Sequence, residues 1–284
     1  MKRIVGIITA LTALAVCGCS ESGDIHLSPC DNTSLTLELD SGRTFLGESI
    51  DGVRQVYWSS GDCIMVNGAI SSEAKFDGEN TKVAKFDFSS VLQYPYNILY
   101  PVAIYKDATT VTLPSLQSAA DGTIATNTLP MAACIVKSGD ASKLHHLAGV
   151  IHLQLRADNL ATNNCVVMVE FKGNDGEQVS GDFAIDYATT TLSPLVDSDA
   201  TKVVGTRVTG ELSTEKATDV FVVVPAREYK KGFTIRVIND AGHYLDKVKA
   251  SGATIEKGTI MKMPEIPFIP TGTLVGVEIP SGGR

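Results

Sequence analysis

The stretch IHLQLR, residues 151–156, alternates the apolar side chains of Ile151, Leu153 and Leu155 with polar ones. A period of two residues is that of a β-strand with one buried face and one solvated face. The stretch SLTLEL, residues 34–39, repeats the alternation nearer the N-terminus. Both stretches therefore predict half-buried strands, one in each half of the chain.

Short apolar runs separated by turn-forming residues fill most of the remaining chain. The runs lie at Val166–Val169, Phe221–Val224 and Phe233–Val237. Pairs such as Asn67-Gly68 and Asp175-Gly176 are typical of the tight turns between strands. No window of twelve or more residues keeps a helical stripe, so the sequence predicts an all-β protein built from β-sandwiches.

A polar, turn-rich segment, Lys137–Lys143 (KSGDASK), interrupts the strands near the middle of the chain. A new alternating strand begins at Leu147. Segments of this composition commonly separate domains. We expect an N-terminal β-sandwich domain over residues 19–144 and a C-terminal one over residues 145–270.

The N-terminus has the pattern of a lipoprotein signal. Lys2 and Arg3 precede the short apolar run Ile4–Val16, and Gly18 precedes Cys19. The run is too short to span a bilayer as a helix, which is typical of a cleaved secretory signal. We expect residues 1–18 to be removed and Cys19 to carry the lipid that attaches the chain to the outer membrane. The alternative is an ordinary secretory signal with incidental cysteines.

Charge and cysteine spacing exclude several classes of partner. The formal net charge is −8, and loss of Lys2 and Arg3 with the signal makes it −10. An acidic chain without a basic cluster is not expected to bind nucleic acid. The cysteines after Cys19 form no CxxC pair, which disfavours structural zinc. Disulfide formation among them stays open; they are Cys30, Cys63, Cys134 and Cys165.

Residues that could support catalysis are few. The chain has no nucleophile elbow, zinc-protease motif, phosphate-binding loop or calcium loop. His145 and His146 are adjacent, so on a strand they point to opposite faces and could not readily share a metal. Asp182 and Asp186 share one side of a strand and are expected to flank an exposed face around Phe183 and Ile185. We therefore expect a protein that is not an enzyme and needs no cofactor.

Several fragments, in this order along the chain, resemble fimbrillins, the subunits of Bacteroidales type V pili and their lipoprotein relatives. The fragments include VYWSSGDCIMVNG (56–68), VTLPSLQ (111–117), LHHLAGVIHLQL (144–155), VSGDFAIDYATTTLSP (179–194) and FVVVPAREYKKGFTIRVIND (221–240). The resemblance implies two tandem transthyretin-like β-sandwiches and export as a lipoprotein precursor.

From its position between Val56 and the Gly61-Asp62 turn, Trp58 is expected in the core.

The resemblance also implies assembly by strand exchange. A protease cuts such subunits after an arginine and releases the first strand, and the C-terminal segment of another subunit fills the groove. Arg43, in the polar turn after SLTLEL, is the first candidate for the cut and Arg54 the second. The released strand would carry Leu35, Leu37 and Leu39.

The C-terminal stretch TGTLVGVEIPSGGR, residues 271–284, is the candidate donor strand. It follows Pro267 and Pro270, which break regular structure. One face of this tail, as an extended strand, would present Thr273, Val275, Val277 and Ile279. The alternative is that the tail completes the sheet of its own domain.

The function expected from these features is that of a structural fimbrial subunit serving cell adhesion. Its partners would be other copies of itself and related pilus subunits. The alternative is a surface lipoprotein that does not polymerise, either a pilus anchor or tip, or a module that binds glycan or host protein.

Overall fold

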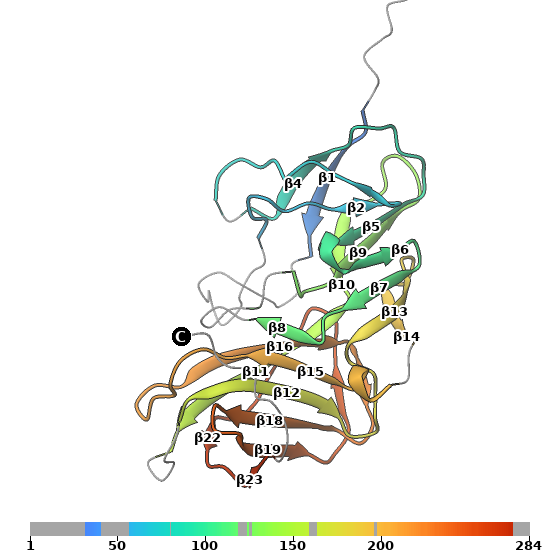
Figure 1. The fold of residues 1–284 in the computed structure, drawn as a ribbon. Coiled ribbons are helices and arrows are strands. Elements are labelled where there is room, and N and C mark those ends of the chain that lie inside the picture. The colour runs from blue at the N-terminus through green and yellow to red at the C-terminus, as the bar shows by residue number, and fades with distance from the viewer. Residues whose placement is uncertain are drawn as a thin grey trace, which may run out of the picture. The chain divides into compact units, whose positions relative to one another are not determined.

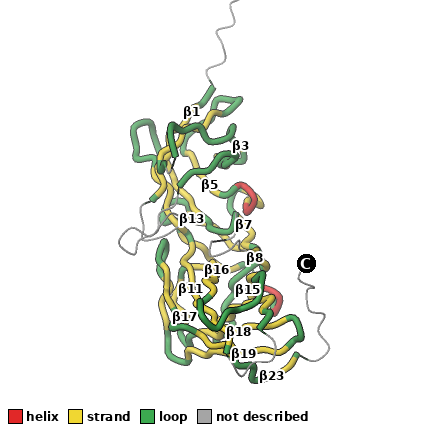
Figure 2. The backbone as a smooth tube through the Cα atoms, turned by 90° about the vertical axis from the view of Figure 1, so that its left-hand side faces the viewer, coloured by secondary structure: helices red, strands yellow, loops and turns green. Residues whose placement is uncertain are grey.

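The computed structural model of the chain describes residues 32–40, 57–79, 81–118, 124, 127–158, 164–195 and 198–274 (Figure 1). Over these residues, turns and loops connect the strands, and the only helices are two short 3₁₀ helices, η1 (Val102–Ile104) and η2 (Asp199–Thr201) (Figure 2). The all-β prediction is confirmed. No helix in this part of the chain is long and apolar enough to cross a membrane.

A seven-stranded sheet, ordered β3-β2-β5-β9-β10-β1-β4, collects the strands nearest the N-terminus. Its members are β1 (Ser34–Leu39), β2 (Met65–Val66), β3 (Ala69–Ile70), β4 (Val83–Asp87), β5 (Tyr96–Tyr100), β9 (Met131–Ile135) and β10 (Lys143–His146). Strand β1 runs parallel to β10 and antiparallel to β4. The first described strand is therefore an interior member of this sheet, paired with β4 over residues 34–38 and with β10 over residues 38–39.

Trp58 lies in the core beneath this sheet, as predicted, with 3% of its surface exposed. Its ring packs edge-on against Phe86 at 4.9 Å and Tyr100 at 5.3 Å between ring centroids. The indole Nε1 donates a hydrogen bond to the Lys82 carbonyl at 3.0 Å, so the one polar group of the ring is satisfied.

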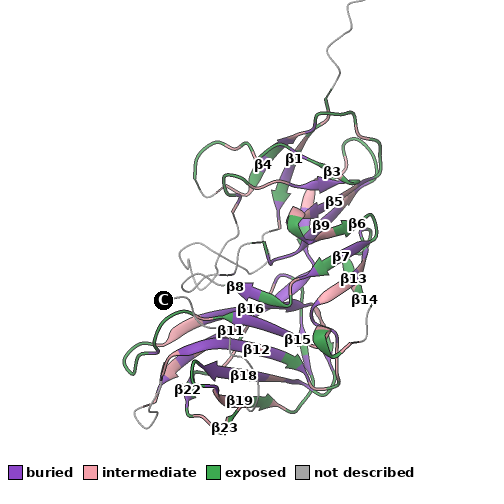
Figure 3. Cartoon of the chain, in the orientation of Figure 1, coloured by how far each residue is buried: buried purple, intermediate pink, exposed green. Residues whose placement is uncertain are grey.

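A second core lies between two further sheets. The six-stranded sheet has the order β23-β19-β18-β12-β15-β8, with β8 (Leu116–Ser118), β12 (Val166–Gly173), β15 (Val203–Arg207), β18 (Phe233–Asn239), β19 (His243–Lys249) and β23 (Gly272–Thr273). The other sheet centres on β11 (Ala148–Ala157), paired with β16 (Thr218–Pro225), β21 (Ile260–Lys262) and β22 (Ile266–Phe268). Side chains of both sheets form one apolar cluster, which makes this part a β-sandwich. Figure 3 shows buried residues along much of β11, β12 and β18.

The alternation of residues 151–156 is confirmed on β11. Ile151, Leu153 and Leu155 are fully buried in that cluster, whereas the polar residues between them are only partly buried. The predicted apolar runs at 166–169, 221–224 and 233–237 likewise fall within β12, β16 and β18.

Strands from before residue 144 also pair with strands that follow it. Strands β6 (Tyr105–Asp107) and β7 (Thr110–Leu113) share a sheet with β13 (Gly181–Asp186) and β14 (Thr191–Pro194), and β8 pairs in parallel with β15. A two-stranded sheet joins β17 (Arg227–Tyr229) to β20 (Ala253–Ile255). The division into domains at residue 144 stays a prediction.

Gln117 of β8 bonds to the backbone of β16 through its side-chain amide. Its Nε2 donates to the Val223 carbonyl at 2.7 Å, and the Val223 N–H donates to its Oε1 at 3.0 Å. Both residues are buried. The amide thus occupies the hydrogen-bonding groups that a neighbouring strand would otherwise use.

Replacing Gln117 by alanine should therefore lower the free energy of unfolding by about 2 kcal/mol, because two buried backbone groups lose their partners. Urea unfolding of the purified variant measures the change. Ser118→Ala, at the exposed neighbouring position, is the matched control and should change stability by less than about 0.5 kcal/mol. Equal effects of the two substitutions would contradict this role of the amide.

Candidate functional site

Strand β1 fills a slot between β10 and β4. On one side the residue pairs are Leu35 with Phe86 and Leu37 with Ala84. On the other side Leu39 pairs with Leu144, the N–H of Glu38 donates to Ser142, and that of Asp40 donates to Leu144. Removal of β1 would leave unpaired backbone groups along both neighbours, which is an arrangement that favours capture of another strand.

The side chains of β1 alternate between the core and solvent. Leu37 and Leu39 are 0% and 1% exposed and Leu35 is partly buried, whereas Thr36 and Glu38 are exposed. This is the alternation predicted for residues 34–39. Burial of the two inner leucines contributes about 3–6 kcal/mol gross. Without β1 the slot would be an apolar groove.

Polar contacts hold β1 at both ends. At its C-terminal end the Asp40 carboxylate lies 3.0 Å from Lys143 Nζ and 3.0 Å from His145 Nδ1. Partial burial alone would raise the pKa of Asp40, but hydrogen bonds from Lys143 and His145 outweigh it and lower the pKa below its usual value.

At the N-terminal end, Ser34 Oγ donates to Asp87 Oδ1 at 2.6 Å. The hydrogen bond from Lys75 Nζ, at 2.7 Å, and that from Ser34 lower the pKa of Asp87 to about 2. Both contacts are on the surface, where solvent screens charges, so each adds little to stability and mainly fixes the register of β1.

The two histidines of β10 point to opposite faces of the strand, as predicted. His145 is exposed beside Asp40, whereas His146 is 2% exposed. Neither ring nitrogen of His146 has a hydrogen-bond partner among the described residues. Burial lowers its pKa from 6.5 to about 4. His146 is therefore a neutral side chain inside the fold.

Six of the predicted site residues lie outside the described residues: Cys19, Arg43, Arg54, Val275, Val277 and Ile279. Thr273 lies in β23, paired with His243 of β19. The N–H of Leu274 donates to the Gly242 carbonyl at 2.9 Å, and its side chain packs beside Met168, Ile238 and Tyr244. The first residues of the tail thus extend the edge of their own sheet.

The two strand aspartates bond to neighbouring residues. Asp182 pairs with Lys106 and accepts a hydrogen bond from Thr112, and Asp186 accepts the N–H groups of the turn that follows it. The expected exposed face around Phe183 and Ile185 is wrong, because these side chains are 1% and 8% exposed. They pack into the cluster that also contains side chains of β7, the antiparallel partner of β13.

Within the described residues no group of three or more histidine, cysteine or acidic side chains could hold a metal. Cys63, Cys134 and Cys165 form no disulfide with one another. Cys30, the fourth cysteine, lies outside the described residues.

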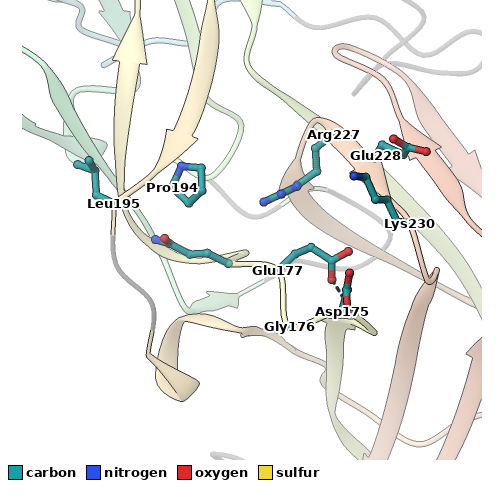
Figure 4. A pocket seen from close by; sticks show the side chains of 9 residues that line it. Asp175, Gly176, Glu177, Pro194, Leu195, Arg227, Glu228 and Lys230 are labelled. Atoms are coloured by element: carbon teal, nitrogen blue, oxygen red, sulfur yellow. Dashed lines mark hydrogen bonds between the residues drawn. The ribbon is translucent and has the colours of Figure 1, made fainter.

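A pocket of about 460 Å³ opens beside β17. Figure 4 shows Arg227 and Lys230 directed toward its interior, opposite Pro194 and Leu195. Neither cation has a carboxylate partner among the described residues, although Glu177 lines the same pocket. Its other lining residues are Asp175, Gly176, Gln178 and Glu228. The pocket thus combines the two cations with three carboxylates and a small apolar wall, so its lining is polar and carries both signs of charge.

No protein-family model matches the chain, and no curated protein does. Solved structures similar to it include a candidate cell adhesion protein from Bacteroides ovatus, at 14% identity, covering 81% of this chain and 92% of the other with a TM-score of 0.47. A candidate cell adhesion protein from Bacteroides fragilis is 10% identical; the match covers 87% of this chain and 99% of the other, with a TM-score of 0.41. A fimbrial protein from Bacteroides ovatus is 13% identical; the match covers 82% of this chain and 49% of the other, with a TM-score of 0.31.

Proposed function

We propose that this chain is a structural subunit of a surface fimbria that polymerises by donor-strand exchange and serves cell adhesion. The observation that supports this most is the position of β1. It is the first described strand, it supplies buried leucines to the core, and Arg43 follows it four residues after Leu39. A single cut after Arg43 would therefore detach one complete strand from the sheet.

The proposed sequence of events begins with export. The chain is anchored to the outer membrane through lipid on Cys19 and folds as two transthyretin-like sandwiches, residues 19–144 and 145–270. Cleavage after Arg43, or after Arg54 as second choice, releases β1. Residues 271–284 of another copy, or of a related pilus subunit, then fill the groove. The protein acts in this scheme without catalysis, cofactor or nucleic acid.

Energetics favour refilling of the groove. Release of β1 exposes the apolar surface that Leu37 and Leu39 had covered, and leaves two strand edges unpaired. Exposed apolar surface and unpaired strand edges of this kind favour binding of another strand. A tail that presents apolar residues at every second position restores both the burial and the backbone hydrogen bonds.

Limited trypsin digestion of residues 20–284, purified without lipid, tests the proposal. We expect N-terminal sequencing to find a cut after Arg43. Unboiled samples in denaturing gels should show a ladder of oligomers, and negative-stain microscopy should show fibres. Removal of residues 271–284 should abolish the ladder, and Arg43→Gln should prevent it. Arg207→Gln, at an exposed position on β15, is the matched control and should leave it unchanged. A protein that stays monomeric after clean cutting would overturn the proposal.

The pocket beside β17 supports a second candidate, a surface lipoprotein that binds a glycan without polymerising. Arg227 and Lys230 could pair with a sugar carboxylate there. In this case galacturonate should shift the NMR signals of residues around the pocket. Arg227→Ala should remove the shifts, and Arg207→Ala should not. Absence of shifts up to millimolar ligand would exclude this candidate.

A further inference from the structure

Strand β1 and the C-terminal tail share a sequence pattern. Residues 33–39 read TSLTLEL, and residues 273–279 read TLVGVEI. Apolar residues occupy the third, fifth and seventh positions of both stretches, a threonine the first and a glutamate the sixth. A proline, Pro280, follows the second stretch where β1 ends in the first.

Building on the function proposed above, we propose that the tail of a second copy enters the slot of β1 in the same direction and register. Val275, Val277 and Ile279 would then take the places of Leu35, Leu37 and Leu39. The incoming strand would run parallel to β10 and antiparallel to β4, as β1 does.

The burial of β1 fits this alignment. The site of Leu35 is partly exposed, and the sites of Leu37 and Leu39 are buried. Ile279, the largest of the three aligned tail residues, would therefore fill a buried site. Gly276 would lie at the exposed position of Thr36, where a side chain adds little. Pro280 would take the place of Asp40, whose N–H donates to the Leu144 carbonyl, so the incoming strand would lack that hydrogen bond and end there.

Charge distinguishes this direction from the reverse one. Glu38 lies beside Lys143 in the register of β1 and β10, and both face solvent. Cleavage after Arg43 removes Asp40, the carboxylate that pairs with Lys143. In the proposed register Glu278 arrives beside Lys143 and replaces that lost partner.

The reverse direction would place Val275 in the site of Leu39 and Gly276 beside Lys143. Glu278 would then stand at the position of Thr36, opposite Lys85. Lys85 already lies 3.7 Å from Asp87, a carboxylate that stays with the cleaved subunit. The proposed direction therefore gives a carboxylate to the lysine that has lost one.

Cysteine cross-linking across subunits tests direction and register. Lys143→Cys combined with Glu278→Cys should yield covalent ladders in boiled, non-reducing gels after trypsin treatment, since directly paired strand residues are close enough for a disulfide. Lys143→Cys combined with Gly276→Cys should not. The single-cysteine variants control for the native thiols.

Each result decides a separate point. Ladders from the pair of cysteines at 143 and 276 would show that the tail enters the slot in the reverse direction. Fibres that cross-link through neither pair would overturn the proposed register of the tail. In both cases the proposed function stands. Absence of oligomers from the unsubstituted protein would overturn the proposed function itself.

A charge exchange gives a second measurement on the full chain. Assembly is started here with a protease that cuts only after arginine, because trypsin would also cut after a lysine at position 278. Glu278→Lys should then slow assembly several-fold, and the added substitution Lys143→Glu should restore the rate because every subunit then carries both changes. Lys85→Glu should not restore it. Restoration by Lys85→Glu alone would show the reverse direction.

Discussion

Replacing Leu37 by alanine is expected to lower the free energy of unfolding of the uncleaved protein by about 3–5 kcal/mol. The side chain is completely buried in the core that also contains Trp58 and Phe86. Its removal takes apolar surface out of that core and leaves a cavity, because the strands on both sides of β1 cannot move far enough to fill the space. Urea unfolding followed by tryptophan fluorescence measures the change, because Trp58 is the only tryptophan.

Thr36→Ala is the matched control for Leu37→Ala. The control side chain is exposed on the same strand, and its loss should change stability by less than about 0.5 kcal/mol. In the assembly proposed above β1 leaves the fold after cleavage, so Leu37→Ala fibres should be as stable as unsubstituted ones. Fibres weakened as much as the precursor would show that β1 stays in place.

Replacing His146 by leucine is expected to remove a large part of the pH dependence of stability. Burial lowers the pKa of His146 in the folded state to about 4, against 6.5 in the unfolded chain. Between these two values the unfolded chain binds the additional proton, so stability is complete above pH 6.5 and falls as the pH falls toward 4. The loss amounts to about 3 kcal/mol.

Chemical unfolding at pH 7 and at pH 4.5 measures the effect. His146→Leu should be at least as stable as the unsubstituted protein at pH 7, because two unpartnered buried nitrogens are replaced by an apolar group. Comparison of the two proteins at each pH cancels the contribution of the carboxyl groups. His145→Ala, at the exposed neighbouring position, should keep the pH dependence, and a variant His146→Leu that keeps it would contradict this account.

Local pattern predicted much of the fold. The alternation of residues 34–39 and 151–156 assigned the buried face of β1 and β11 correctly, because the period of a strand is a local property. The core position of Trp58 and the opposite faces of His145 and His146 could be predicted for the same reason.

Pairing between distant strands could not be predicted from the sequence alone. The order that places β1 between β10 and β4 joins residues about fifty and a hundred positions apart, and the sequence carries no signal for that choice. The expected exposed face at Phe183 and Ile185 was wrong because an alternating stretch does not reveal which strand covers it. Gln117 was missed because a buried amide that bonds a distant backbone resembles any polar residue of a turn.

The polar contacts at the end of β1 were equally hidden. Asp40 follows an alternating stretch, and Lys143 and His145 lie a hundred residues later. A charged residue next to a predicted strand is usually solvated, so only the parallel pairing of β1 with β10 brings the three together.

In the fibre proposed above, the pairing of β7 with β13 and of β8 with β15 would have a mechanical consequence. Tension would enter each subunit at the slot between β10 and β4 and leave it through the tail after β23. Between these points lie two strand ladders, residues 110–113 against 181–184 and residues 116–118 against 205–207. The hydrogen bonds of both ladders would resist separation of the strands that they join. Such a fibre should transmit load stiffly and lengthen only when these ladders break.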